Sequence, residues 1–347
     1  MKALLYHQFQ QTPFVDTVPD PSPPDGGIVV QVNASGLCRS DWHGWMGYDK
    51  DITLPHIPGH EFAGEVVACG PGVKHIKNGD RVTVPFVAGC GSCIYCHQGD
   101  PQVCEGQFQP GFTHWGSFAE YVALQYADFN VVRLPGSVSY ENAAALGCRF
   151  ATSYRALVHQ GKVKPEQYVT IFGCGGVGLS AIMIAKALGA RVIAIDLKPA
   201  ALILATQAGA DLTADAQDPH LVERVLAFSS GGVHCTLDAL GHPQIIRNCF
   251  KVLRKRGKHV QVGLLHPDAH SVALPMDQVI SDELEILGSH GLQSAYYPQL
   301  FDLLTTHNLD LAELIQKRLK LSEAADALSD MDQHKVAGIQ LITDFES

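Results

Sequence analysis

Short apolar runs separated by turn-forming segments dominate the first part of the chain. Runs rich in β-branched and other apolar residues cover positions 27–36, 62–70, 80–86 and 118–124. Proline and glycine punctuate them, most densely in the segment PDPSPPDGG at 19–27. Many short strands with such turn signals are typical of a small β barrel or sandwich. We therefore predict a β-rich domain over residues 1–150.

From residue 151 onward, strand-like and helix-like patterns alternate. The buried-strand run YVTIFG at 168–173 precedes a helical periodicity at 179–190 and a second strand-like run at 191–196. The same alternation continues with strands expected at 235–240, 259–263 and 284–290 and helices expected at 220–228 and 244–255. Alternating strands and helices build a parallel sheet, so the predicted class is α/β.

The tail of the chain carries two helix-like segments at 296–306 and 322–331 and a strand-like run at 338–345. Its pattern does not assign it to either of the preceding parts. The chain has 347 residues, more than one core holds comfortably, so we expect two domains.

Composition narrows the class of protein. Hydrophobic residues make up 46% and charged residues 17%, as in an ordinary globular protein. The formal net charge of −10 argues against a nucleic-acid partner, which needs a basic face. The apolar runs are too short to span a bilayer, so no membrane partner is expected. The N-terminus lacks the pattern of a signal peptide, which predicts a cytoplasmic protein.

The glycine-rich turn GCGGVG joins the first strand of the α/β part to its first helix. Gly173, Gly175 and Gly178 fit the pattern G-x-G-x-x-G, and the next strand ends in Asp196. Such a turn allows a tight bend, a close approach of the backbone to a pyrophosphate, and close packing of helix on strand. In this context the pattern predicts a dinucleotide site, and a plain glycine-rich connection is the alternative.

Asp196 bears on the choice of cofactor. A carboxylate there accepts hydrogen bonds from the adenosine ribose and repels a 2′-phosphate, so NAD is favoured over NADP. Lys198 follows two residues later and softens that preference. The alternative is a solvated acid at the end of a strand.

Four of the ten cysteines crowd into one loop. Cys90, Cys93, Cys96 and Cys104 have the spacing C-x2-C-x2-C-x7-C. Four thiolates this close form a tetrahedral structural zinc site, with an iron–sulfur cluster as the alternative of similar ligand chemistry. Two disulfides would require an oxidising compartment, to which nothing in the sequence points.

Three further residues form a possible second metal site, although they lie far apart in the chain. Cys38, His60 and Cys148 would together make a Cys2His set with room for one more ligand, an arrangement known for catalytic zinc. The spacing alone does not decide between this site and a buried thiol beside a polar His60–Glu61 loop pair.

These pieces appear in a characteristic order along essentially the whole chain: GLCRSDWH, GHEFAGEVV, the four-cysteine lobe, LGCRFATSYRA, GCGGVG and the acid after the second strand. The ordered set resembles the zinc-dependent alcohol dehydrogenases of the medium-chain dehydrogenase/reductase superfamily. The resemblance implies a GroES-like catalytic domain over 1–150 and 290–347, with a Rossmann NAD-binding domain over 151–289. It also implies two zinc ions per chain, one catalytic at Cys38, His60 and Cys148 and one structural at the four-cysteine lobe.

Roles for single residues of the catalytic site follow from the same resemblance. Glu61 matches an acid behind the metal that orients the site or ligates transiently. Asp41 matches the carboxylate that hydrogen-bonds the ligand histidine. Ser40 matches the hydroxyl that touches the substrate oxygen, and His43 the outer end of a proton relay.

Contacts to the cofactor are implied for five more residues. Arg39 matches a residue that contacts the pyrophosphate, and Thr152 matches one near the nicotinamide. We also expect contacts from Gly176 and Val177 in the turn and from Val262 near the end of the strand at 259–263.

The substrate pocket is less well defined by the resemblance. Phe86 matches a pocket aromatic. Trp42, Trp45 and the segment at 112–118 match no family position, and Trp42 either lines the pocket or fills the core.

The expected reaction is reversible hydride transfer from a primary or secondary alcohol to NAD, giving an aldehyde or ketone. A polyol or amino-alcohol dehydrogenase of the same superfamily remains an alternative, as does a non-catalytic NAD-binding zinc protein. Family members of this length imply a homodimer or homotetramer.

Overall fold

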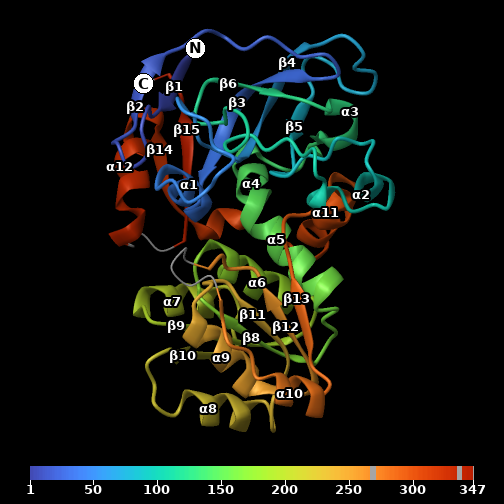
Figure 1. Ribbon diagram of the computed structural model, residues 1–347, viewed down its shortest axis with the longest axis vertical. Coiled ribbons are helices and arrows are strands. Elements are labelled where there is room, and N and C mark those ends of the chain that lie inside the picture. The colour runs from blue at the N-terminus through green and yellow to red at the C-terminus, as the bar shows by residue number, and fades with distance from the viewer. Residues whose placement is uncertain (266–270, 334–337, 347) are drawn as a thin grey trace. The chain divides into compact units, whose positions relative to one another are not determined.

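The computed structural model describes residues 1–265, 271–333 and 338–346. The chain divides into two compact units (Figure 1), of which the first is Met1–Ala151 with Gly291–Ser347 and the second is Thr152–His290. Residues 334–337 and 347 of the predicted catalytic domain lie outside the described residues. Within the described ranges, no helix has both the length and the apolar character needed to cross a membrane.

A seven-stranded sheet forms the base of the first unit, in the order β14-β15-β3-β4-β5-β7, with β6 also paired to β3. Strand β15 runs antiparallel to β3, with Leu341 opposite Gly36, so the C-terminal tail belongs to the same sheet as the N-terminal strands. The strands of this unit are β1 (Lys2–Leu5), β2 (Phe14–Thr17), β3 (Ile28–Leu37), β4 (Glu61–Cys69), β5 (Arg81–Thr83), β6 (Tyr121–Leu124), β7 (Val132–Arg133), β14 (Ile315–Lys320) and β15 (Ile339–Asp344).

Short helices follow or flank these strands. The helices are α1 (Arg39–Trp45), α2 (Ile94–His97), α3 (Ala127–Asn130), α4 (Tyr140–Ala145), α11 (Tyr297–Thr306) and α12 (Ala324–Ser329). After α4 the chain continues in a π-helical turn, η2 (Leu146–Phe150), where Gly147 has non-helical backbone angles. The buried side chains of β3, β4, α1 and α12 share one hydrophobic core, which gives the loops above it a rigid base.

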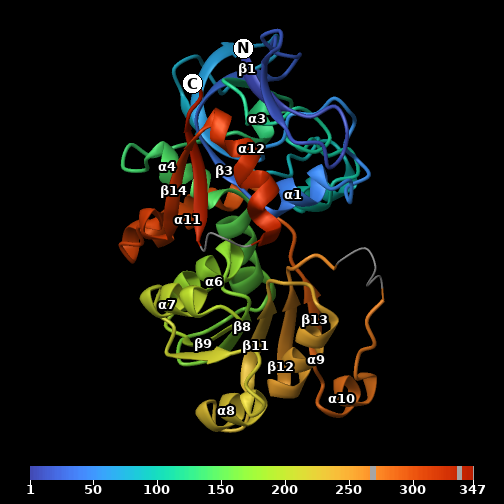
Figure 2. The ribbon, with the colours of Figure 1, turned by 90° about the vertical axis from the view of Figure 1, so that its left-hand side faces the viewer.

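The second unit contains a six-stranded parallel sheet in the order β10-β9-β8-β11-β12-β13. Figure 2 shows α6 and α7 on one side of this sheet and α9 and α10 on the other, as in a doubly wound fold. Its elements are β8 (Tyr168–Phe172), α6 (Gly176–Ala187), β9 (Arg191–Asp196), α7 (Pro199–Gln207), β10 (Leu212–Asp215), α8 (Leu221–Phe228), β11 (Val233–Asp238), α9 (Pro243–Val252), β12 (Leu253–Gln261), α10 (Met276–Ser281) and β13 (Glu285–Gly288). The predicted α/β class with a β-rich partner is confirmed.

Several local details differ from the sequence pattern. The helix expected at 244–255 ends at Val252, because Leu253 adopts an extended conformation and begins β12. A number of short elements were not predicted, among them strands β10 and β14 and helices α1 and α7. β10, β14 and α7 each bury two or fewer of their side chains, so hydrophobic periodicity gives little signal for them.

Candidate functional site

The glycine-rich turn lies between β8 and α6, as the sequence predicts. Gly173 has φ of +92°, a conformation that favours glycine, and a Cβ there would meet the Leu240 side chain at 2.6 Å. A side chain at Gly178 would collide with the Gly173 carbonyl, so close packing of helix on strand requires glycine. A Cβ at Gly175 would meet nothing within 4 Å. The backbone at the N-terminus of α6 is therefore accessible to an anionic group.

Asp196, at the end of β9, is tied to this turn. Its Oδ2 accepts a hydrogen bond from the Cys174 backbone N–H at 2.7 Å, and its Oδ1 accepts one from the Lys198 N–H at 2.9 Å. The carboxylate is thus held beside the turn by two backbone donors, and each oxygen keeps further acceptor capacity for ribose hydroxyls.

The other expected cofactor residues are spread over both units. Thr152 is buried in the second unit, and its hydroxyl has no hydrogen-bond partner among the described residues. Val262 follows β12, and its N–H donates to the Asp238 carbonyl at 3.0 Å. In the first unit, the Arg39 guanidinium pairs with Asp332 at 3.1 Å and lies 3.7 Å from the centre of a Trp42 ring.

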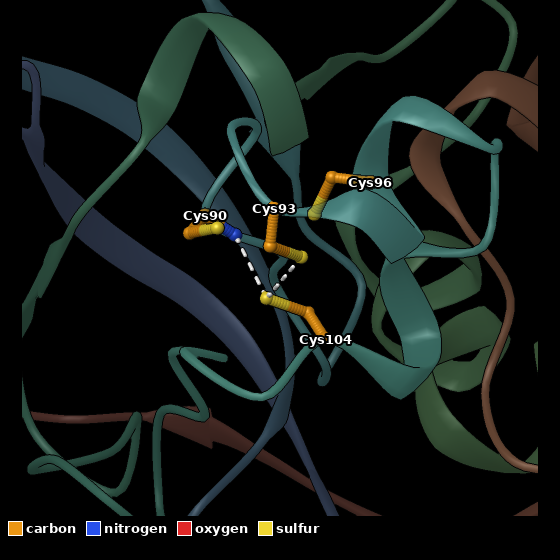
Figure 3. Close-up of side chains that lie close together, drawn as sticks. All are labelled: Cys90, Cys93, Cys96 and Cys104. Atoms are coloured by element: carbon orange, nitrogen blue, oxygen red, sulfur yellow. Dashed lines mark hydrogen bonds between the residues drawn. The ribbon is translucent and has the colours of Figure 1, made fainter.

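The four lobe cysteines converge on one point (Figure 3), and their sulfur atoms all lie within 4.8 Å of one another. Cys93 precedes α2, Cys96 lies in it, and Cys90 and Cys104 come from the adjoining loops. No disulfide joins them. Hydrogen bonds from Ser92 lower the pKa of Cys90 to about 6, which favours the thiolate. This arrangement suits a tetrahedral site made entirely of sulfur ligands.

A second cluster forms at the carboxyl end of β3. Cys38 follows β3, His60 precedes β4, and Cys148 lies in η2, yet their ligand atoms and one of Glu61 all lie within 4.8 Å of one another. A hydrogen bond with Cys148 lowers the pKa of Cys38 well below its ordinary value, while the same bond and burial raise the pKa of Cys148. Because thiolates are the ligand form of cysteine, a bound divalent cation would displace the remaining thiol proton of this pair.

The Asp41 carboxylate orients the His60 ring. Its Nδ1 lies 2.9 Å from the Asp41 Oδ1, and its Nε2 is buried without a hydrogen-bond partner among the described residues. Asp41 is itself held by the backbone N–H groups of Cys38 at 2.9 Å and Gly59 at 3.0 Å. A buried acceptor without a partner is costly in a native fold, so the Nε2 lone pair fits a metal ion placed between Cys38 and Cys148.

Aromatic side chains wall this second cluster. The His60 ring lies 5.9 Å from Phe86 and 4.8 Å from Phe112, measured between ring centres. Ile52 and Val87 complete an apolar group against which Cys148 packs. Phe86 was expected here from the sequence. Phe112 was only noted as part of the unassigned segment at 112–118.

Ser40, Trp42 and His43 all lie on α1. Ser40 and His43 are half-buried and three residues apart, so they share one face of the helix. Trp42 is buried in the core of the first unit, where its ring lies 5.5 Å from His43 and 5.9 Å from Tyr48.

Sequence reasoning missed two buried residues near the second cluster. Arg149, next to Cys148, forms an ion pair with Glu61. Burial raises the pKa of Glu61, and the Arg149 guanidinium opposes that shift. Tyr297 is buried, and its hydroxyl finds no hydrogen-bond partner in the part of the chain that the structure describes. Burial together with the charges of Cys148 and Glu61 raises its pKa. Arg149 could have been suspected from its place beside an expected ligand cysteine, whereas nothing in the sequence marks Tyr297.

Comparison with known proteins identifies the family. Residues 24–136 match the alcohol dehydrogenase GroES-like domain, and residues 176–306 match the zinc-binding dehydrogenase domain. The chain is 36% identical to an alcohol dehydrogenase of Geobacillus stearothermophilus over 83% of this chain and 84% of that protein. It is 31% identical to an NAD-dependent alcohol dehydrogenase of Sulfolobus acidocaldarius over 99% of both chains.

The solved structures agree with this assignment. An alcohol dehydrogenase from Thermus sp. ATN1 superposes with a TM-score of 0.91 and 29% identity, covering 99% of this chain and 100% of that chain. The chain therefore belongs to the zinc-dependent alcohol dehydrogenase family of the medium-chain dehydrogenase/reductase superfamily.

Proposed function

We propose that this protein is a zinc-containing alcohol dehydrogenase that reversibly transfers hydride from a primary or secondary alcohol to NAD. The observation that carries this proposal is the second cluster, where Cys38, Cys148 and the unpartnered Nε2 of His60 converge. Three protein ligands leave a coordination position for substrate, which is the arrangement of catalytic zinc sites. The four-cysteine lobe holds a second, structural zinc ion.

The residues around the cluster divide the chemical work. When bound, Zn²⁺ supplies Lewis-acid chemistry that lowers the pKa of an alcohol hydroxyl. Ser40 accepts the hydroxyl proton, and His43, on the same face of α1, passes it on to solvent. Asp41 keeps the His60 Nε2 lone pair directed into the cluster, and Phe86 and Phe112 exclude water from it. Glu61 is a positioning group behind the cluster.

NAD supplies the hydride acceptor, and residues of the second unit together with Arg39 of the first bind it. The turn at Gly173, Gly175 and Gly178, with Gly176 and Val177 between them, fits the pyrophosphate, while Asp196 fits the adenosine ribose. Thr152 and Val262 contact the nicotinamide half, Arg39 the pyrophosphate, and Lys198 the adenosine end. An Asp196→Ala variant tests this assignment, because it should raise the ratio of kcat/KM for NADP to that for NAD. An unchanged ratio would contradict the ribose contact.

We assign one function to each of the two compact units. Residues 1–150 and 290–347 form the catalytic domain, and residues 151–289 form the NAD-binding domain. The small-molecule alcohol is the substrate partner, and the protein works in the cytoplasm as a homodimer or homotetramer. These assignments rest on the family to which the chain belongs.

An alkyl or aryl alcohol suits the site better than a polyol. The side chains packed on Cys148 are aromatic and aliphatic, whereas a polyol requires hydrogen-bonding partners for each of its hydroxyl groups. A non-catalytic role is disfavoured because Ser40, His43 and the complete ligand set are all present.

Metal analysis combined with a substrate panel tests the proposal. We expect about two zinc ions per chain and NADH formation, followed at 340 nm, with primary, secondary or benzylic alcohols. Two zinc ions without NADH formation from any alcohol would contradict the enzyme assignment. One zinc ion per chain would contradict the assignment of the second cluster.

A further inference from the structure

The Glu61 carboxylate belongs to the second cluster by position but is fully engaged elsewhere. Its Oε1 accepts hydrogen bonds from the backbone N–H and the Nε–H of Arg149, both at 3.0 Å, and its Oε2 accepts one from an Arg149 terminal nitrogen. The other terminal nitrogen of Arg149 donates to the Leu37 carbonyl at 3.4 Å. Both side chains are buried, with Glu61 at 0% and Arg149 at 4% exposure, so solvent does not compete for them.

The backbone around this ion pair is shaped to contain it. A Cβ at Gly36 would lie 2.5 Å from an Arg149 nitrogen and 2.6 Å from a Glu61 oxygen. A Cβ at Gly147 would lie 2.6 Å from the Glu61 Cβ. Gly36 on β3 therefore leaves room for the charged groups of the Glu61–Arg149 pair, and Gly147 in η2 lets that backbone approach the first carbons of Glu61. Because several positions of the fold accommodate the Glu61–Arg149 ion pair, we treat the pair as part of the site.

Charge balance explains what the pair does to the metal site. Two thiolates, from Cys38 and Cys148, balance a divalent cation, which leaves the Glu61 carboxylate as an uncompensated buried charge. Such a charge is strongly disfavoured, so a Glu61 that stays ionised must either pair with a cation or bind the metal. Its carboxylate is close enough to the three ligand atoms for the second outcome. A fourth protein ligand would turn the site into the closed, structural type.

We propose that Arg149 is a positioning residue that holds the Glu61 carboxylate off the metal ion and so keeps the fourth coordination position available to substrate. The inference rests on the zinc site assigned above to Cys38, His60 and Cys148. It differs from a purely structural ion pair, which would contribute to folding without affecting the ligands of the metal.

Cobalt substitution separates these two roles. Co²⁺ reports ligand number through its visible absorption, and the spectrum of the four-cysteine site, recorded on a Cys38→Ser variant, is subtracted. In Arg149→Met we expect a changed second-site spectrum. We also expect release of Zn²⁺ from this site to a chelator to slow by about tenfold, as one protein ligand is gained. Release from the four-cysteine site should stay unchanged and serves as the internal control.

A double variant provides the matched control. Glu61→Leu combined with Arg149→Met removes the carboxylate, so its spectrum and release rate should return toward those of the wild type. Arg149→Lys keeps the positive charge but loses the paired guanidinium N–H donors to Glu61. It should therefore change the spectrum and the release rate in the same direction but by less. This variant replaces Arg149→Met in the test if Arg149→Met does not fold. A folded Arg149→Met or Arg149→Lys protein with a wild-type spectrum and a lowered melting temperature would overturn the proposal.

The wild-type measurement distinguishes this inference from the function on which it rests. If wild-type protein binds Co²⁺ only at the four-cysteine lobe, the catalytic metal assignment fails and the inference fails with it. If the wild type binds two Co²⁺ ions and the Arg149 variants show the same spectrum and release rate as the wild type, the catalytic metal assignment stands. Only the role proposed for Arg149 is then contradicted.

Discussion

The two candidate metal clusters both contain cysteine thiols but are assembled in opposite ways. The four-cysteine lobe draws its candidate ligands from one continuous segment of the chain, and two of its cysteines are half-exposed. The second cluster draws its ligands from three separate parts of the fold, and Cys38, His60 and Glu61 in it are buried. Local spacing suffices for a site that holds a loop together. A reactive site needs rigid support, exclusion of water and neighbours that set its charge.

Removing a ligand from the second cluster should have the largest effect on activity. We expect Cys38→Ser to lower kcat by at least about a thousandfold, because the Lewis acid contributes several kcal/mol to the transition state. Zinc content should fall from about two ions per chain to about one. Cys69→Ser changes a thiol that belongs to neither cluster and should leave both values unchanged. Near-normal turnover in Cys38→Ser would contradict a catalytic role for the second cluster, which is the proposed difference between the two sites.

The matching change in the lobe should affect stability more than chemistry. We expect Cys93→Ser to lower the melting temperature by about 10 °C, since the loop loses a metal staple worth a few kcal/mol. Thermal unfolding followed by circular dichroism measures the change, and kcat per folded molecule should stay near the wild-type value. A folded variant that keeps its melting temperature but loses its rate would assign the lobe a direct role in the reaction.

Loosening the support of His60 should have the smallest effect of the three. Asp41→Asn keeps the shape of the side chain but weakens its hydrogen bond to the His60 Nδ1–H. We expect the zinc affinity of the second cluster to fall by about 10- to 100-fold, measured by chelator competition. Asp51→Asn, on an exposed loop, is the matched control. Equal affinities in the two variants would mean that Asp41 does not support the ligand.

Features that depend on chain neighbours were predictable. The GCGGVG turn and the acid at the end of β9 lie where the sequence pattern puts them, because a strand–turn–helix unit is defined by local periodicity and glycine placement. The four-cysteine lobe was predictable for the same reason, because its cysteines lie close together in the chain.

The elements that were not predicted from the sequence show the limit of local patterns. Strand β14, IQKRLK, buries only its two apolar residues, and partners supplied by β15 make it a strand.

The sequence by itself therefore determined the α/β class, the dinucleotide turn and the thiolate lobe, since each is written in residues close together in the chain. The spacing of Cys38, His60 and Cys148 left open whether they meet, and only the resemblance to known alcohol dehydrogenases implied it. The tertiary structure brings them together through the pairing of β3 with β4 and the position of η2. It also decided that Arg149 neutralises Glu61 and that Phe112 covers His60. Those contacts depend on packing free energy distributed over the whole core, which no local spacing records.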